Sequence, residues 1–467
     1  MPRRLASAAK RAVRPDLTSS RNLSAGRMRF FHVAPLQLSE GSGGAPARGP
    51  ASACAVRHIG ASTSTWGIYA EGAEAGSWTN IRYTAQGVPV QKHLDQLAGK
   101  IGPRLIGTPG NRAAREYIAG FLGQLGFPVN RQGFSRTISI PESGCIRVGE
   151  EDRWRECWPC LGTPSCEAER FSVADVGAGR REDWERVDVS GRAALCRRGE
   201  LHESVKVDLA AGNGARAVLF YVEYEDCLYS ARAASRVAEI PAAVIRPSLA
   251  RSLARSANAT IELSVSASLA DAKCANLWCD LGGGEGEHIV LCAHYDSRPF
   301  TAGANDNAAG AACLLELARR LSLLRLRNRY RCIFFDGEEA VVAGSTAYVG
   351  EFGVDGVRAV VNTDAVGFGR PKALLSDRDG RLSAELAALA AQSAARYGIE
   401  LGAARSRTGL SDHAPFRNAG VAECLWISDH PNHGRETDLD TPDRIDTGHL
   451  EDLVSMYADL LETRLAG

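Results

Sequence analysis

With 467 residues, the chain is longer than an ordinary single domain, so we expect two folded units. Hydrophobic residues make up 45% and charged residues 24%, which is typical of a globular protein and excludes a disordered or fibrous one. Lysine plus arginine and aspartate plus glutamate each number 55, so no net charge would attract nucleic acid or an anionic membrane. No run of 18 apolar residues occurs, and we therefore expect neither a transmembrane helix nor a membrane partner.

Residues 1–85 are rich in Gly, Ser, Ala and Arg and show little apolar periodicity, so no folded element is predicted there. The basic, acid-poor first 30 residues resemble an organelle transit segment in composition, but no amphipathic helix is evident and a disordered leader is the preferred interpretation. No apolar stretch typical of a secretory signal follows the early charges. Several of the 13 cysteines lie in apolar runs, which suits free thiols in a reducing compartment. We expect a soluble protein, with the cytoplasm as the favoured compartment.

The predicted elements start with two helices, because apolar residues recur at helical spacing in VQKHLDQLAGKIG and AAREYIAGFLGQLG. From about residue 141 the pattern changes to short β-rich runs separated by charged and glycine-containing turns. Residues 141–268 are therefore predicted to form a smaller, β-rich inserted domain.

After the insert, apolar strands alternate with helices. We predict strands at 288–296, 330–339 and 357–367, and helices at 308–321 and 449–465. Near-continuous apolar strands of this kind are buried on both faces of a sheet. The fold class is therefore α/β, with a mostly parallel mixed sheet flanked by helices, formed by residues 86–140 and 269–467.

Acidic and imidazole side chains gather where these strands end. They are His294, Asp296, Asp306, Glu338, Glu339 and Asp364. In open α/β sheets, functional sites form beyond the carboxyl ends of the strands. So many carboxylates in one place would repel one another unless cations lay between them, and the sequence therefore predicts a site for divalent metal ions. Asp296, two residues after His294, is placed to accept the other imidazole proton once the histidine binds a metal ion.

Hydrolysis by a two-metal site requires a bridging carboxylate, terminal ligands for each ion and a base for the shared water. Asp306, which is preceded by glycine and leads into a helix, is placed to bridge two ions. His294 and Asp364 would complete one ion and Glu339 the other. Glu338, adjacent to this last ligand, would act as the base.

The same segments resemble the co-catalytic two-zinc aminopeptidase family, which includes bacterial leucyl aminopeptidase, aminopeptidase Y and the glutamate carboxypeptidases. The matching strings are AHYDS, GANDNAAG, FFDGEEAVVAGSTAYV, NTDAVG, SDHAPF and DTPDRID, together with GPRLIGTPGN nearer the amino terminus. The resemblance implies a zinc exopeptidase fold, two divalent metal ions and a peptide substrate. The roles stated above are also those that the resemblance implies for His294, Asp306, Glu338, Glu339 and Asp364.

The insert resembles the protease-associated domain that interrupts this family. The matching stretches are GRAALCRRGELHESVKVDLAAGNGARAVLFY and IPAAVIRP. The resemblance implies no catalytic role for this domain. It implies a domain that either shapes substrate access or acts as a stabilising lid.

One position departs from the family pattern. The family's last metal ligand is a histidine followed by threonine, four residues before the aspartate of the DTPD string, and here that place holds Glu436. A carboxylate also binds zinc, so Glu436 is the first candidate for this ligand and His433 is the second. A further carboxylate makes the site less positive and favours harder ions, so zinc is the first expectation and manganese or cobalt are alternatives.

These observations predict a metal-dependent aminopeptidase that removes amino-terminal residues from peptides. One alternative is a carboxypeptidase of the same family, in which Arg405, Arg407 and Arg417 near SDHAPF would bind the substrate carboxylate. Another is a non-catalytic binding homologue that lost the second metal ion with the histidine ligand. The presence of Glu338, which binding alone does not require, argues against that second alternative.

Overall fold

The computed structural model describes residues 90–256, 258–283, 286–324, 326, 328–406, 409–431 and 433–465. All of them belong to one compact unit of the chain, residues 56–467. The predicted leader at residues 1–85 lies outside the described residues. Among the described helices, none combines the length and the apolar character that crossing a bilayer requires.

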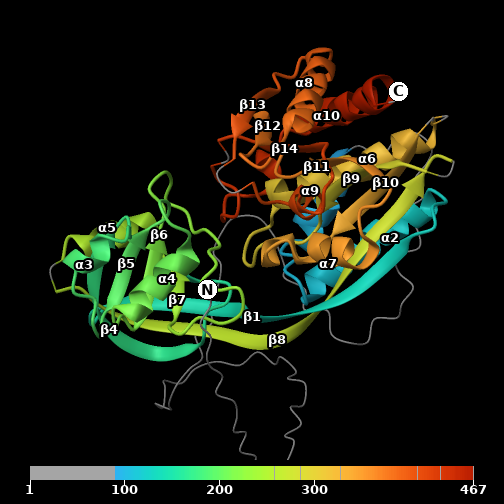
Figure 1. Ribbon diagram of the computed structural model, residues 1–467. Coiled ribbons are helices and arrows are strands. Elements are labelled where there is room, and N and C mark those ends of the chain that lie inside the picture. The colour runs from blue at the N-terminus through green and yellow to red at the C-terminus, as the bar shows by residue number, and fades with distance from the viewer. Residues whose placement is uncertain are drawn as a thin grey trace, which may run out of the picture. The chain divides into compact units, whose positions relative to one another are not determined.

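The carboxy-terminal half of the chain forms a mixed sheet whose central strands are parallel (Figure 1). Its strands follow the spatial order β13, β12, β14, β11, β9, β10 and β8. Their bounds are Gly402–Arg405, Pro371–Leu375, Cys424–Asp429, Val357–Thr363, His288–His294, Arg329–Phe335 and Thr260–Leu281. β9 pairs in parallel with both β10 and β11, and every residue of β9 is buried. The predicted α/β fold class is confirmed.

Helices cover both faces of this sheet. Successive residues of a strand point to opposite faces, and because these strands are apolar throughout, both faces need to be covered. Ile289 and Leu291 of β9 pack into a core with α1, α2, α6, α8 and α10, whereas Val290 and Cys292 pack with α7 and α9. In the same order, these helices span Val90–Leu94, Pro109–Gln124, Gly310–Ser322, Arg381–Ala395, Thr447–Asp459, Ala343–Phe352 and His413–Asn418. Short helical turns at Asp95–Ile101, Ala304–Ala309, Glu338–Ala340, Pro442–Arg444 and Leu460–Arg464 complete this half of the chain.

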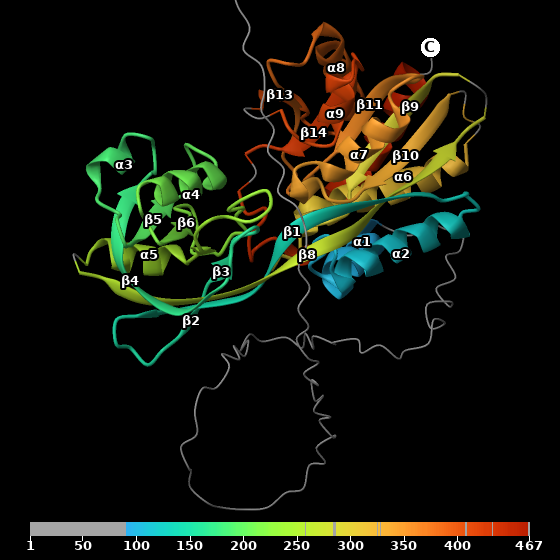
Figure 2. The same ribbon diagram turned by 60° about the horizontal axis from the view of Figure 1, so that its bottom comes forward.

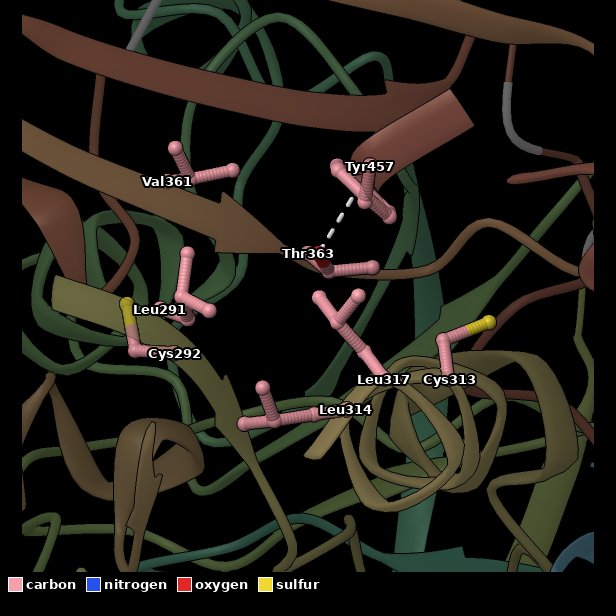
Figure 3. Close-up of a pocket in the computed structure, with 8 residues that line it drawn as sticks. All are labelled: Leu291, Cys292, Cys313, Leu314, Leu317, Val361, Thr363 and Tyr457. Atoms are coloured by element: carbon pink, nitrogen blue, oxygen red, sulfur yellow. Dashed lines mark hydrogen bonds between the residues drawn. The ribbon is translucent and has the colours of Figure 1, made fainter. Parts of the chain in front are cut away.

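The core between β9, β11, α6 and α10 is closely packed. A gap of about 10 Å³ remains there, lined mainly by apolar side chains (Figure 3). A hydrogen bond of 2.9 Å joins the hydroxyl groups of Thr363 and Tyr457 at its edge. A space of this size holds at most about one water molecule, so it is a packing gap and not a ligand site.

Two long strands connect this sheet to the insert. β1, Asn130–Val148, pairs antiparallel with β8 from Asn130 opposite Trp278 to Val148 opposite Ile261, and both strands can be followed in Figure 2. The predicted boundaries of the insert, 141 and 268, fall inside these two strands. β-structure therefore runs through both boundaries without a linker.

The insert contains helices as well as strands. Its strands β2 to β7 span Arg155–Glu156, Trp158–Pro159, Cys166–Gly177, Ala193–Arg197, Ala217–Tyr221 and Ala242–Val244, and β4 to β7 pair in parallel. Helices α3, α4 and α5 span Asp183–Arg186, Glu203–Gly212 and Pro247–Ala254. The short β-rich runs of the sequence become β5, β6 and β7, whereas the sequence analysis predicted none of the three helices.

Candidate metal centre and catalytic site

The residues predicted to bind metal converge at the carboxyl edge of the parallel strands. β9 ends at His294, β10 leads into the helical turn with Glu338 and Glu339, and β11 is followed directly by Asp364. Two groups of buried side chains have ligand atoms within 4.8 Å of one another. The first group is His294, Asp306 and Asp364, and the second is Asp306, Glu339 and Glu436. Asp306 is common to both groups, as a bridging ligand would be.

The donor atoms of the first group fit a divalent cation. Nε2 of His294 lies 3.2 Å from Oδ1 of Asp306 and 3.6 Å from Oδ1 of Asp364. Neither His294 Nε2 nor Asp364 Oδ1 has a hydrogen-bond partner among the described residues, although both atoms are buried. A buried polar atom without a partner is costly, and a bound cation would remove that cost. Burial lowers the pKa of His294, but the surrounding aspartates outweigh this effect and raise it, which shows how strongly the cluster attracts positive charge.

Asp296 holds the histidine and the turn after β10 together. Its Oδ1 lies 3.4 Å from Nδ1 of His294, the position predicted for a partner of the metal-binding imidazole. Its carboxylate also accepts hydrogen bonds from the backbone N–H groups of Glu338 and Glu339, at 3.1 and 3.2 Å. Asp296 therefore positions two of the predicted functional elements relative to each other.

The loop that carries Asp306 is fixed by residues that the sequence analysis did not single out. Asp440, the first aspartate of DTPD, accepts hydrogen bonds from the backbone N–H groups of Asn305 and Asp306, at 2.6 and 3.2 Å. A Cβ atom on Gly310 would lie 2.3 Å from Oδ1 of Asn307, so only glycine fits at the end of GANDNAAG. The strings that resemble the family therefore contain structural residues as well as ligands.

Arg104 supports the same loop from the amino-terminal region. It is fully buried and donates hydrogen bonds to five backbone carbonyl oxygens, those of Leu97, Gly102, Tyr295, Ala302 and Gly303. Arg104 belongs to the GPRLIGTPGN string, and its contacts connect this distant segment to the loop of the candidate ligand Asp306. On the other side of the site, Ser411 of SDHAPF donates a 2.7 Å hydrogen bond to Oδ2 of Asp364.

Glu338 is placed as a free carboxylate beside the ligands. Its side chain is half-buried and makes no hydrogen bond or ion pair with any residue that the structure describes. Burial raises its pKa well above the usual range, and the neighbouring carboxylates of Glu339 and Asp364 add to this effect although His294 opposes it. A carboxyl group in such surroundings holds a proton more readily than an ordinary glutamate does.

The structure brings Glu436, and not His433, to the second group. Oε2 of Glu436 accepts a 2.7 Å hydrogen bond from Nη2 of Arg198, and its Oε1 lies 3.2 Å from Nη2 of Arg298. Burial raises the pKa of Glu436, but nearby arginines outweigh this effect and keep the pKa well below the usual range. His433 is exposed, with its ring 5.0 Å from that of Tyr224.

A cavity of about 220 Å³ opens onto the two groups, and both parts of the chain contribute to its wall. The insert contributes Arg198, His202, Glu203, Tyr229, Ser230, Ala231 and Arg232. The arginines predicted to bind a substrate carboxylate lie elsewhere. Arg405 is exposed and paired with Asp377, Arg417 pairs with Asp379, and Arg407 lies outside the described residues.

Comparison with known proteins gives two family matches. Residues 276–461 match the profile of peptidase family M28, and residues 158–253 match that of the PA domain. Residues 276–461 are therefore similar to peptidase family M28. The family and the inserted PA domain confirm the resemblance on which the sequence analysis relied.

Two bacterial aminopeptidases are among the proteins similar to this chain. Aminopeptidase YwaD of Bacillus subtilis is 27% identical over 348 residues, which are 71% of this chain and 74% of YwaD. The probable lipoprotein aminopeptidase LpqL of Mycobacterium tuberculosis is 29% identical over 60% of this chain and 58% of LpqL, so the match spans less than two thirds of that protein.

Solved structures show the same fold. BSAP, a zinc aminopeptidase from Bacillus subtilis, superposes with a TM-score of 0.66 and 24% identity over 79% of this chain and 93% of its own. A peptidase M28 precursor from Shewanella amazonensis gives the same TM-score with 18% identity over 81% of this chain and 93% of its own. These two likenesses extend through most of the described residues.

Proposed function

We propose that this protein is a metal-dependent aminopeptidase that removes the amino-terminal residue of a peptide bound in the 220 Å³ cavity. The observation that carries the proposal is the group of His294, Asp306 and Asp364, which has unpartnered donor atoms beside the free carboxylate of Glu338. The family match and the names of the relatives support it. The cavity is smaller than the roughly 300–1,000 Å³ of sites that enclose a drug-sized ligand, which suits the end of a peptide better than its middle.

In this proposal, the chain's own residues position a water molecule and move its proton. His294, Asp306 and Asp364 would hold a divalent ion, which would supply Lewis-acid polarisation and lower the pKa of a bound water. Glu338 takes a proton from the attacking water and passes it to the leaving amine, because its carboxylate borders the cavity and has no competing contact among the described residues. Asp296 fixes the imidazole through the contacts of its carboxylate and backbone oxygens with Nδ1 of His294, and it fixes the turn by accepting a hydrogen bond from the backbone N–H of Glu338.

The identity of the ion follows from its donors. One imidazole and two carboxylates suit zinc, so zinc is the proposed ion, and manganese or cobalt remain alternatives. The predicted second ion would have Asp306, Glu339 and Glu436 as ligands, and their oxygen chemistry fits a divalent ion. However, arginines already contact both oxygens of Glu436 and Oε2 of Glu339, so the second position fits an ion less well than the first.

One observation favours a carboxypeptidase as the second candidate function. Arg232 of the insert lines the cavity, has no ion pair among the described residues, and its buried Nε has no hydrogen-bond partner. A guanidinium that faces a cavity and makes no ion pair would bind a substrate carboxylate. This residue, rather than Arg405 or Arg417, is the structural basis for that alternative.

The test is hydrolysis of aminoacyl nitroanilides and of short peptides, before and after removal of metal by a chelator. We expect release of the amino-terminal residue that is lost on chelation and restored by zinc, manganese or cobalt. Amino-terminal acetylation should block cleavage, and carboxy-terminal amidation should not. The opposite pattern of blocking would establish the carboxypeptidase. No cleavage of any peptide under any of the three metals would leave the non-catalytic binding homologue as the better interpretation.

A further inference from the structure

We propose that the guanidinium group of Arg298 takes the place of the second metal ion, so that the site binds one divalent ion beside a fixed, positively charged side chain. The proposal rests on the proposed function only for the location of the site. It concerns how many ions the protein binds, and it can therefore be tested without an activity measurement.

Arg298 lies between the two carboxylates that would complete the second position. Its Nε lies 2.5 Å from Oε2 of Glu339, and its Nη2 lies 3.2 Å from Oε1 of Glu436. The side chain is buried, with 9% of its surface exposed. An ion held by both carboxylates would have to displace these contacts and leave a buried guanidinium without a partner, which is a costly arrangement.

A second arginine makes Glu436 unavailable from the other side. Nη2 of Arg198, from the insert, donates a 2.7 Å hydrogen bond to Oε2 of Glu436. Each oxygen of Glu436 therefore faces a different guanidinium group. A histidine at this position could not accept two charge-assisted hydrogen bonds, so a carboxylate at 436 suits Arg198 and Arg298 better than the family's usual ligand would.

Each carboxylate of the second group already has a positively charged partner. Asp306, Glu339 and Glu436 lie within 4 Å of the guanidinium groups of Arg435, Arg298 and Arg198, in that order. A divalent ion at the second position would therefore add buried positive charge that no further carboxylate of this group offsets.

The vacant donor atoms also belong mainly to the first position. Nε2 of His294 and Oδ1 of Asp364 are buried without a hydrogen-bond partner among the described residues. In the second group, only Oε1 of Glu339 is buried without a hydrogen-bond partner among the described residues. The other carboxylate oxygens of Glu339 and Glu436 contact arginines. A guanidinium supplies positive charge and N–H donors but no vacant coordination position, so Glu339 and Glu436 hold Arg298 in place instead of binding a metal ion.

The experiment is to count bound zinc by elemental analysis after the full chain is equilibrated with excess zinc and separated from free metal. We expect one equivalent in the wild type and none in His294→Ala, because the first position is the only one that binds an ion. The double variant Arg298→Leu/Glu436→His should gain a second equivalent. Arg232→Ala is the matched control, since Arg232 lines the same cavity without pairing with Glu339 or Glu436 among the described residues, and it should retain one equivalent.

The proposal would be overturned if the wild type bound two equivalents of zinc, or if His294→Ala still bound one. Either result would show that an ion displaces Arg298 from Glu339 and Glu436. A second equivalent in Arg232→Ala would also overturn it, because the loss of any nearby positive charge would then be sufficient. If the double variant does not fold, the wild type and His294→Ala still decide the question. One bound ion without peptide hydrolysis would leave this proposal intact and refute the proposed function instead.

Discussion

Replacement of Glu338 by glutamine separates catalysis from folding at this site. The carboxylate of Glu338 has no hydrogen bond or ion pair among the described residues, so Glu338→Gln removes no stabilising contact that they make. Burial and the neighbouring carboxylates raise the pKa of Glu338, so its negative charge does not stabilise the fold. We therefore expect the free energy of unfolding to change by no more than about 0.5 kcal/mol. The lost proton transfer should lower kcat by about 10²-fold to 10⁴-fold, or about 3 to 5 kcal/mol in the activation free energy.

The assay compares kcat for an aminoacyl nitroanilide, the zinc content and the urea midpoint of the wild type and Glu338→Gln. Glu203→Gln is a control, because it makes the same substitution in the same cavity on the insert side, where Glu203 contacts Arg198 and Tyr229 and belongs to neither carboxylate group, and its kcat should stay within a few fold. If Glu338→Gln kept a tenth or more of the wild-type kcat, Glu338 would not be the base. A loss of zinc or a large loss of stability together with the activity would also refute the reasoning, since both should remain unchanged.

Three further changes test other parts of the structure. Arg104→Met removes five hydrogen bonds from a buried cation to carbonyl oxygens. We expect the free energy of unfolding in urea to fall by more than about 4 kcal/mol, and a fall of less than about 1 kcal/mol would contradict this. Burial lowers the pKa of His93 from 6.5 to about 4. As the pH falls from 6.5 towards 4, the unfolded chain therefore binds a proton before the folded protein does, and the free energy of unfolding falls by up to about 1.4 kcal/mol per pH unit. His93→Gln should give a shallower fall over the same range, and an unchanged slope would exclude His93 as its source. Arg198→Met should lower the thermal midpoint by breaking the ion pair with Glu436, and no shift would mean that this pair contributes nothing to stability.

The sequence could predict which polar residues meet at the edge of the sheet because of a physical rule about parallel sheets. Strands such as β9 and β11 carry near-continuous apolar runs, which indicate that they are buried side by side. Their carboxyl ends then have to meet at one edge, and polar residues that follow these ends lie close together. His294 and Asp364 could therefore be placed together although 69 residues separate them along the chain.

The arginines of the site could not be predicted in the same way. Arg198 reaches Glu436 from the insert, and no local spacing relates residues 238 positions apart in different parts of the fold. Arg298 did carry a signal, because it lies two residues after Asp296 in the loop that follows His294. The helices of the insert were missed for a simpler reason. α4 has residues of mixed polarity and α3 has only four residues, so neither gives a clear helical period.

The contacts of Glu436 also bear on the role of the insert. Its side chain pairs with Arg198, and its backbone oxygen accepts a 2.7 Å hydrogen bond from the N–H group of Ser230, so one residue beside the proposed metal centre is held twice by the insert. A second connection follows at Asp438, which pairs with Arg246. A domain that only covered the cavity would not need to hold a residue of the second carboxylate group. The insert therefore fixes a residue of the second carboxylate group, because without Arg198 one oxygen of the buried Glu436 would lose its charged partner.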